Sequence, residues 1–233
     1  LGMSYSAKKP VVDRMLEALP GTLMLAGTAL VFTLLYALPA GIISALNRNK
    51  WVDYLLRAAS FVGVSMPTFW LGLVLIYIFG LKLGLVPIAT SRVTPIGVIL
   101  PAATLAVVVG SKYMRQVRLV ILEEMEKDYV IGARARGVSE MKILFGHILP
   151  NAVLPLITIL GVVMGWLLGG VAVVEMVFSW PGLGNMAIYA ITMRDYPLIE
   201  GFVLWVALAY MCINALIDAS YILLDPRLKR ERA

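Results

Sequence analysis

The sequence predicts an all-α bundle of membrane-spanning helices, and composition is the first reason. Hydrophobic residues form 61% of the 233-residue chain and charged residues 15%, whereas a soluble domain is about half apolar and about a quarter charged. The second reason is that five stretches are apolar and, at ~20 residues or more, long enough to cross a bilayer. They are residues 20–46, 55–80, 96–120, 151–178 and 199–224. Each contains Gly or Pro, which membrane helices tolerate when neighbouring helices satisfy the freed backbone groups.

The distribution of Lys and Arg orients these spans. If the connecting segments alternate across the membrane, fourteen of the 20 basic residues fall on one side. These are Arg48, Lys50, Arg57, Lys112, Arg115, Arg118, Lys127, Arg134, Arg136, Lys142, Arg227, Lys229, Arg230 and Arg232. Because cytoplasmic loops carry the excess of Lys and Arg, we expect this side, with residues 121–150 and the C-terminus, to be cytoplasmic. Residues 1–18 then form an external lead-in, and residues 226–233 a cytoplasmic tail.

The net charge of +6 needs no nucleic acid to explain it. The bias of Lys and Arg towards the cytoplasm and the attraction of basic residues to anionic lipid account for it. The partner that composition implies is therefore the lipid bilayer.

The longest polar interruption of the chain is residues 128–150. It predicts two short helices around a stop at Gly137. The first covers about Tyr129–Arg136, and the side chain of Ser139 can cap the second. The apolar face of the second helix is expected to consist of Met141, Leu144, Phe145 and Ile148.

The spacing Ala133-x3-Gly137-x11-Leu149-Pro150 in this segment resembles the coupling loop, or EAA loop, of bacterial and archaeal ABC importer permeases. In that family the loop is a cytoplasmic helix that docks in a groove of the ATPase subunit. By this resemblance the four residues belong to the ATPase-coupling element. The alternative is a basic amphipathic helix that lies on the inner face of the membrane.

Departures from the general loop pattern indicate one branch of that family. Ile131 and Gly132 stand where Glu and the first Ala of the pattern belong. The run Ala-Arg-Ala-Arg-Gly at residues 133–137 is instead similar to the dipeptide/oligopeptide/nickel branch. This resemblance makes Arg134 and Arg136 polar contacts to the ATPase groove.

Small residues recur at regular spacing in the predicted span 151–178. Gly161, Gly165 and Gly169 are four residues apart, so they share one helix face that another helix can approach closely. The face serves either packing within the bundle or contact with a second subunit or the transport pathway. The sequence leaves both open.

A second pair of motifs lies nearer the C-terminus. Phe-Ser-Trp-Pro-Gly-Leu-Gly occupies residues 178–184 and Arg-Asp-Tyr-Pro occupies residues 194–197. Pro-Gly after an aromatic residue ends a helix in a tight turn, and Trp180 can anchor at the membrane interface. At this separation the motifs resemble the same permease branch, in which they form an external re-entrant loop near the substrate entrance. The external loop is thus expected at residues 179–198. Its assigned residues are Trp180, Pro181, Gly182, Gly184, Arg194 and Asp195.

The sequence offers no familiar catalytic motif. It contains no phosphate loop ending in Gly-Lys-Ser/Thr, so ATP hydrolysis is expected on a separate subunit. It contains no cluster with metal-ligand spacing, and we interpret the single His147 as a polar residue of the coupling surface. Glu175 and Asp218 are acids within predicted spans and hence functional candidates by default. We interpret both as structural, with Glu175 near the outer end of its helix and within reach of water.

The family resemblance extends over nearly the whole chain and implies the type I ABC importer permease fold, with the transmembrane domain at residues 19–225. It implies a permease that moves dipeptides or oligopeptides by alternating access across the cytoplasmic (inner) membrane of a bacterium or archaeon. A nickel or metal-chelate permease of the same family is the alternative, and a secondary carrier or channel is the alternative outside it. The implied partners are a second, similar permease subunit (a heterodimer), two ATP-binding subunits and an extracytoplasmic solute-binding protein. No cofactor or metal is implied.

The start of the chain, Leu-Gly-Met-Ser, is similar to a segment that follows an earlier spanning helix in that family. We therefore expect a fragment that lacks its first spanning helix. A natural five-helix protein is the alternative.

Overall fold

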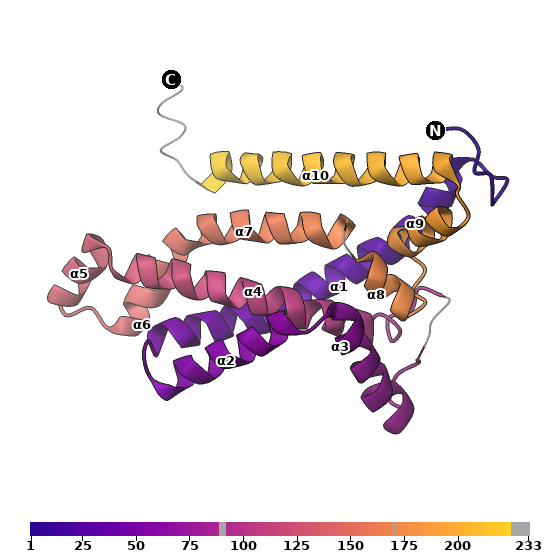
Figure 1. The fold of residues 1–233 in the computed structure, drawn as a ribbon. Coiled ribbons are helices and arrows are strands. Elements are labelled where there is room, and N and C mark those ends of the chain that lie inside the picture. The colour runs from indigo at the N-terminus through magenta and orange to yellow at the C-terminus, as the bar shows by residue number, and fades with distance from the viewer. Residues whose placement is uncertain (89–91, 170, 225–233) are drawn as a thin grey trace, which may run out of the picture.

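A computed structural model describes residues 1–88, 92–169 and 171–224, and all named secondary-structure elements in these ranges are helical. Four long helices run roughly side by side in an elongated bundle, with shorter helices at its two ends (Figure 1). In chain order the elements are α1 (Val11–Leu46), α2 (Trp51–Ser65), α3 (Thr68–Leu75), η1 (Ile76–Lys82, π-helical), α4 (Ile99–Met125), α5 (Asp128–Ala135), α6 (Glu140–Ile143), η2 (Leu144–Ile148, π-helical), α7 (Leu149–Gly169), α8 (Ala172–Val177), α9 (Leu183–Thr192) and α10 (Tyr196–Leu224).

Three of the five predicted spans are long, apolar helices among the described residues. They are Val11–Leu46, Glu140–Leu168 and Tyr196–Ser220. The predicted span 55–80 is a broken one, because α2 and the following helix meet at an angle of 101°. α4 is 27 residues long, but its apolar stretch is interrupted from Lys112 onward by basic residues, so length and hydropathy do not identify it as a span.

The break after α2 has a local cause. Met66 is extended, with φ −78° and ψ 126°, because a residue that precedes proline, here Pro67, is biased away from the helical region. α1 instead continues through Pro20 and Pro39. It also begins at Val11, so much of the expected external lead-in belongs to the first long helix.

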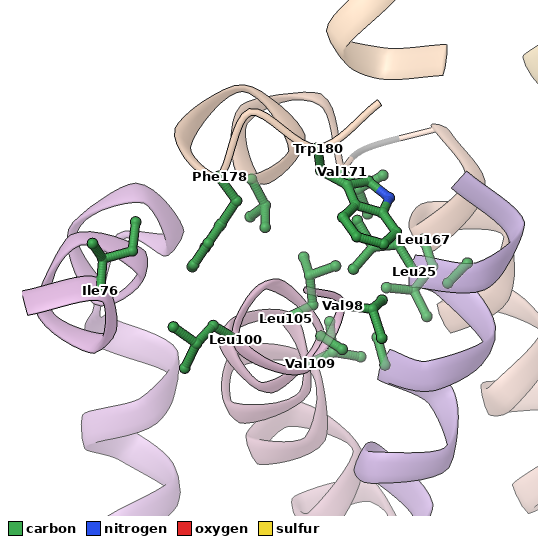
Figure 2. Close-up of a cluster of buried hydrophobic side chains, with 14 residues drawn as sticks. Leu25, Ile76, Val98, Leu100, Leu105, Val109, Leu167, Val171, Phe178 and Trp180 are labelled. Atoms are coloured by element: carbon green, nitrogen blue, oxygen red, sulfur yellow. The ribbon is translucent and has the colours of Figure 1, made fainter. Parts of the chain in front are cut away.

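α4 is the central helix and contacts α1, α2, α3, α7 and α8. Figure 2 shows apolar side chains from α1, η1 and the segment around Trp180 converging on it. The labelled members of this cluster are Leu25, Ile76, Val98, Leu100, Leu105, Val109, Leu167, Val171, Phe178 and Trp180. A second cluster joins Val117 and Ile121 of α4 to Val130, Ile143 and Ile148. Apolar packing therefore connects α4 to both ends of the bundle.

A buried ion pair that the sequence did not reveal joins α1, α2 and α4. Arg118 donates two hydrogen bonds to the carboxylate of Asp53, from Nε and Nη2, each 2.8 Å long. The Ser44 hydroxyl (2.6 Å) and the backbone amide of Asn49 (3.1 Å) donate hydrogen bonds to the same carboxylate. Asp53 is fully buried, and these four donors compensate its charge, as a buried charge requires.

The two regions that the motifs singled out lie at opposite ends of the bundle. α5 and α6 are at one end, whereas α8, α9 and the N-terminal residues are at the other (Figure 1). The predicted tail at residues 226–233 lies outside the described residues.

Candidate functional site

The polar segment 128–150 forms a helical hairpin that projects from the end of α4 (Figure 1). Its turn lies at Gly137, whose φ of +76° is in the left-handed region. Backbone hydrogen bonds close the turn, from the Gly137 amide to the Arg134 carbonyl (2.9 Å) and from the Val138 amide to the Ala133 carbonyl (3.2 Å). Residues other than glycine rarely adopt this backbone conformation, so the glycine at position 137 permits the turn of the hairpin.

The two arms of the hairpin are held together by a charged pair. Arg134 donates from Nε and Nη2 to the two carboxylate oxygens of Glu140, over 2.8 and 3.1 Å. This two-point contact links α5 and α6 across the turn at a partly exposed site, so its contribution to stability is small. Ala133 is buried beneath the turn, whereas Arg136 is exposed at its tip. Of the two arginines assigned to the coupling surface, Arg134 is thus engaged within the chain.

The second arm differs from its sequence prediction. Leu144 and Ile148 are buried, but Met141 and Phe145 are 63% and 61% exposed. The prediction of one apolar face was therefore half correct. The bundle covers the side of this face that contains Leu144 and Ile148 and leaves the side with Met141 and Phe145 exposed. Met141 and Phe145 are four residues apart and form an exposed apolar pair. Ser139 precedes α6, but its side chain makes no capping hydrogen bond, contrary to the prediction.

The hairpin joins α7 without a break. Leu149 is the first residue of α7 and Pro150 the second, directly after the π-helical turn Leu144–Ile148. A proline ring displaces the carbonyl four residues earlier, and the wider π turn accommodates this.

The first arm is attached to the end of α4 by a second polar contact. The Tyr129 hydroxyl donates to the buried Glu124 carboxylate over 2.6 Å. Burial, together with this hydrogen bond, raises the pKa of Tyr129 to about 12. The phenol therefore stays protonated, and able to donate this hydrogen bond, at pH values near 10 where an ordinary tyrosine begins to ionise.

At the opposite end, Trp180 is fully buried, so the prediction that it anchors at the membrane interface was wrong. Its indole Nε1 donates to the carbonyl of Gly21 in α1 over 2.9 Å. A Cβ atom on Gly21 would lie 1.8 Å from the carbonyl oxygen of Pro181, and one on Gly184 would lie 2.5 Å from Cα of Ala172. The glycines are thus needed for close backbone approach.

Glu175 is the centre of this packing. The Thr22 hydroxyl (2.8 Å) and the backbone amide of Asn185 (2.9 Å) donate hydrogen bonds to its carboxylate. The carboxylate lies at the N-terminus of α9, where backbone amides lack partners within the helix. Thr22 in turn accepts a hydrogen bond from the Leu183 amide over 2.8 Å. Gly182 leaves room for the carboxylate, since a Cβ atom there would lie 2.1 Å from Oε1. Glu175 is fully buried, so it does not reach water as predicted.

Asp195, just before α10, ties the N-terminal residues to this end of the bundle. Its Oδ2 accepts hydrogen bonds from the Ser4 hydroxyl (2.5 Å), the Ser6 amide (2.9 Å) and the Ser6 hydroxyl (2.7 Å). Burial alone would raise the pKa of Asp195, but these donors outweigh it and hold the pKa well below its usual range. The neighbouring Arg194 is exposed, with a positive φ of 54°.

The glycine face of α7 packs within the chain. A Cβ atom on Gly161 would lie 1.9 Å from Cδ1 of Ile217, and one on Gly165 would lie 2.7 Å from the Tyr210 ring. Both glycines therefore face α10 of the same chain. Gly169 ends α7, and its surroundings are outside the described residues.

The remaining candidates are dispersed. Asp218 is exposed on α10, His147 is exposed in η2, and Cys212 is exposed on α10. In the described part of the chain, no three His, Cys, Asp or Glu side chains are placed to hold a metal ion.

Comparison with known proteins identifies a family. The model of the family "Binding-protein-dependent transport system inner membrane component" matches residues 37–230. The glutathione transport system permease protein GsiC of Escherichia coli O6:H1 is 37% identical over 229 residues, which are 98% of this chain and 74% of the relative. GsiC of Escherichia coli K12 is 37% identical over 228 residues, with the same coverage.

Solved structures agree on the fold. The inward-facing MetNI methionine ABC transporter in its native crystal form has a TM-score of 0.69 at 19% identity, over 90% of this chain and 97% of that chain. An amino acid ABC transporter crystallised with histidines has a TM-score of 0.65 at 18% identity, over 89% and 92%. The predicted fold class, the type I importer permease fold, is confirmed.

Proposed function

This chain belongs to the family of inner membrane components of binding-protein-dependent transport systems, and we propose that it forms a permease for short peptides. It is an ABC importer permease subunit, and its relatives are transport permeases rather than enzymes. The peptide assignment, the partners and the roles of individual residues are our proposals.

The hairpin of residues 128–150 is the observation that carries the coupling proposal. An exposed apolar pair, Met141 and Phe145, and the exposed Arg136 lie on one small element whose two arms are linked by the Arg134–Glu140 pair. Exposed apolar side chains with a polar rim are the usual composition of a protein–protein contact. We propose that this surface docks on an ATP-binding subunit, with Gly137, Ala133, Leu149 and Pro150 shaping it.

Force applied to the hairpin has a packed route into the bundle. Val130 of α5 and Ile143 and Ile148 of the second arm share one core with Val117 and Ile121 of α4. Close-packed interiors transmit displacement rather than absorb it. ATP-driven closure of two ATPase subunits then moves α4 and α7 together and switches the pathway between inward and outward access.

The opposite end of the bundle is proposed as the external face. In the sequence, fourteen of the 20 basic residues fall in or next to the segments on the hairpin side, and this excess supports a cytoplasmic location for the hairpin and the C-terminus. The 179–198 loop, fixed on α1 through Trp180 and Glu175, then receives solute from an extracytoplasmic binding protein. A second, similar permease subunit completes the pathway.

The names of the relatives support a peptide as the solute. GsiC is named for glutathione transport, and glutathione is itself a tripeptide. The relatives' names and the resemblance of the motifs to the dipeptide/oligopeptide/nickel branch are therefore both consistent with a peptide as the solute.

ATP-driven uptake by the complete complex in vesicles tests this function. The panel contains dipeptides, tripeptides, glutathione and nickel chelates, each with the cognate binding protein. Uptake of at least one peptide that stops without ATP supports the proposal, whereas uptake of nickel chelates alone overturns the peptide assignment. Met141→Ser with Phe145→Ser should abolish uptake, while Leu85→Ser, at an equally exposed position outside the hairpin, should not.

A further inference from the structure

A pocket of about 200 Å³ opens between α4 and α7, in the middle of the bundle. Four valines form most of its wall, and Lys112 and Trp166 supply its polar and aromatic members. Both of these side chains are exposed in the single chain. An exposed lysine in an otherwise apolar wall requires an explanation.

Lys112 lies at the depth of the spanning helices. The pocket residues Val162 and Val163 lie in the second half of α7 (Leu149–Gly169), more than one turn from its end. Two residues before Lys112, Gly110 packs on the Tyr36 ring, ten residues from the end of α1. An ammonium group at this depth is too costly to expose to lipid, so such groups face a water-filled cavity or the interior of an assembly.

The other basic residues of α4 already have partners. Arg118 is bonded to Asp53, and the Arg115 guanidinium lies over the Phe61 ring, 5.1 Å from its centroid. For Lys112, the described residues offer no carboxylate within 4 Å. Its charge is therefore available to a group from outside the chain.

We propose that Lys112 and Trp166 form a subsite that binds the carboxylate of the solute as it passes along the wall of the pathway. The proposal rests on the proposed peptide function, since a peptide carries a terminal carboxylate. The ammonium group supplies up to three donors to that carboxylate. Trp166 and the valines contact the adjoining apolar atoms.

The geometry suits a transient site. A pathway site must bind well enough to admit the solute and weakly enough to release it. A single exposed lysine beside an open apolar wall meets this requirement better than a closed cage of charges. The pocket accommodates one end of a peptide, and the binding protein retains its own selectivity.

Uptake of matched solutes by the complete complex tests the subsite. We compare a dipeptide that has a free carboxylate with its C-terminal amide, in wild type, Lys112→Gln, Lys112→Arg and the exposed-lysine control Lys50→Gln. Because the binding protein is the same throughout, its own preference cancels in the comparison. Lys112→Gln should reduce the preference for the free carboxylate, measured as the ratio of kcat/KM values, by about tenfold. Lys112→Arg and Lys50→Gln should keep it.

An unchanged ratio in Lys112→Gln would overturn the subsite, as would an equal loss of both solutes. The latter result would indicate that Lys112 pairs with an acid of the second permease instead. Peptide uptake by the wild type separately tests the proposed function, so the two failures are distinguishable.

Chemical labelling provides a readout that needs no transport. Lys112→Cys in a Cys212→Ser background carries a single thiol. A charged, membrane-impermeant thiol reagent should modify it in the ATP-bound or the ATP-free complex, while the Cys212→Ser parent stays unmodified. Absence of modification in both states would contradict a place on the pathway wall.

Discussion

The hydroxyl of Thr22 donates a 2.8 Å hydrogen bond to the carboxylate of Glu175, across 153 positions of sequence. The bond joins the N-terminal half of α1 to the segment that leads into residues 179–198. The same carboxylate also accepts a hydrogen bond from the backbone amide of Asn185 at the start of α9. The buried side chain of Glu175, in α8, is therefore bonded to both α1 and α9. This arrangement ties α1, α8 and α9 together at the end of the bundle opposite the hairpin.

Glu175→Gln should lower the stability of the chain. The new NH2 group would face a backbone N–H or the Thr22 hydroxyl, and one buried donor would lose its acceptor, at a cost of about 1–3 kcal/mol. The thermal unfolding midpoint in detergent measures this. Glu123→Gln, at an exposed position of α4, is the matched control, and equal midpoints for the two variants would contradict the role of Glu175.

Gly21→Ala should be strongly destabilising, because the added methyl group would lie 1.8 Å from the backbone oxygen of Pro181, which cannot move aside cheaply. Overpacking of this kind costs about 1–3 kcal/mol or more. Gly27→Ala on the same helix meets nothing within 4 Å and should be neutral or stabilising. The comparison of their unfolding midpoints is decisive, and a midpoint for Gly21→Ala as high as that of Gly27→Ala would be inconsistent with the packing of Pro181 on α1.

Gly137→Ala should impair coupling without disrupting the bundle. Alanine in the left-handed conformation costs roughly 1–2 kcal/mol, which favours a different turn and displaces Met141 and Phe145. We expect reduced ATP-driven uptake and weaker co-purification of the ATPase subunits. Gly146→Ala has equally open space but no positive φ, so it should behave as the wild type. Normal uptake by Gly137→Ala would show that the turn geometry is dispensable.

Asp195 should hold the N-terminal residues in place over a wide range of pH. Its pKa is depressed in the folded chain, so its contribution to stability is complete above the unfolded value of about 3.9 and is lost as pH falls from there towards the folded pKa. Hydrogen exchange of residues 1–10 measures this. Protection should persist from pH 7 to about 4 and disappear in Asp195→Asn, but not in the exposed control Asp13→Asn. Loss of wild-type protection already at pH 6 would contradict the depressed pKa.

Hydropathy located the helices, but not their breaks or ends. The predicted span 55–80 divides at Met66–Pro67 into helices at 101° to each other. The proline at position 67 is a local signal for that break. Two other prolines, Pro20 and Pro39, nevertheless lie inside α1, which continues through both. The presence of a proline alone therefore does not distinguish a break from a continuous helix.

The motifs located both candidate regions, but not the environments of their side chains. Trp180 and Glu175 were expected near water, and both are fully buried. The glycines at positions 182 and 184 were a sequence signal for the burial of Glu175. Glycines permit a close approach of the backbone, and such an approach near an acidic residue suggests a buried carboxylate. One donor to Glu175, the Thr22 hydroxyl, and the acceptor for Trp180, the Gly21 carbonyl, are both more than 150 positions away, and no local pattern indicates them.

The sequence by itself determined that the chain enters a membrane, the positions of three long apolar helices, and where the hairpin turns. Each of these follows from terms that are local to a segment, namely the transfer of apolar residues out of water and the backbone freedom of glycine. Only the tertiary structure decided which face of each helix is covered, and which donor meets each buried charge. Arg118 meets Asp53, Ser4 meets Asp195, and Lys112 is left without a carboxylate among the described residues. These pairings depend on how distant helices approach one another, and the short range of a hydrogen bond makes them sensitive to displacements of about 1 Å.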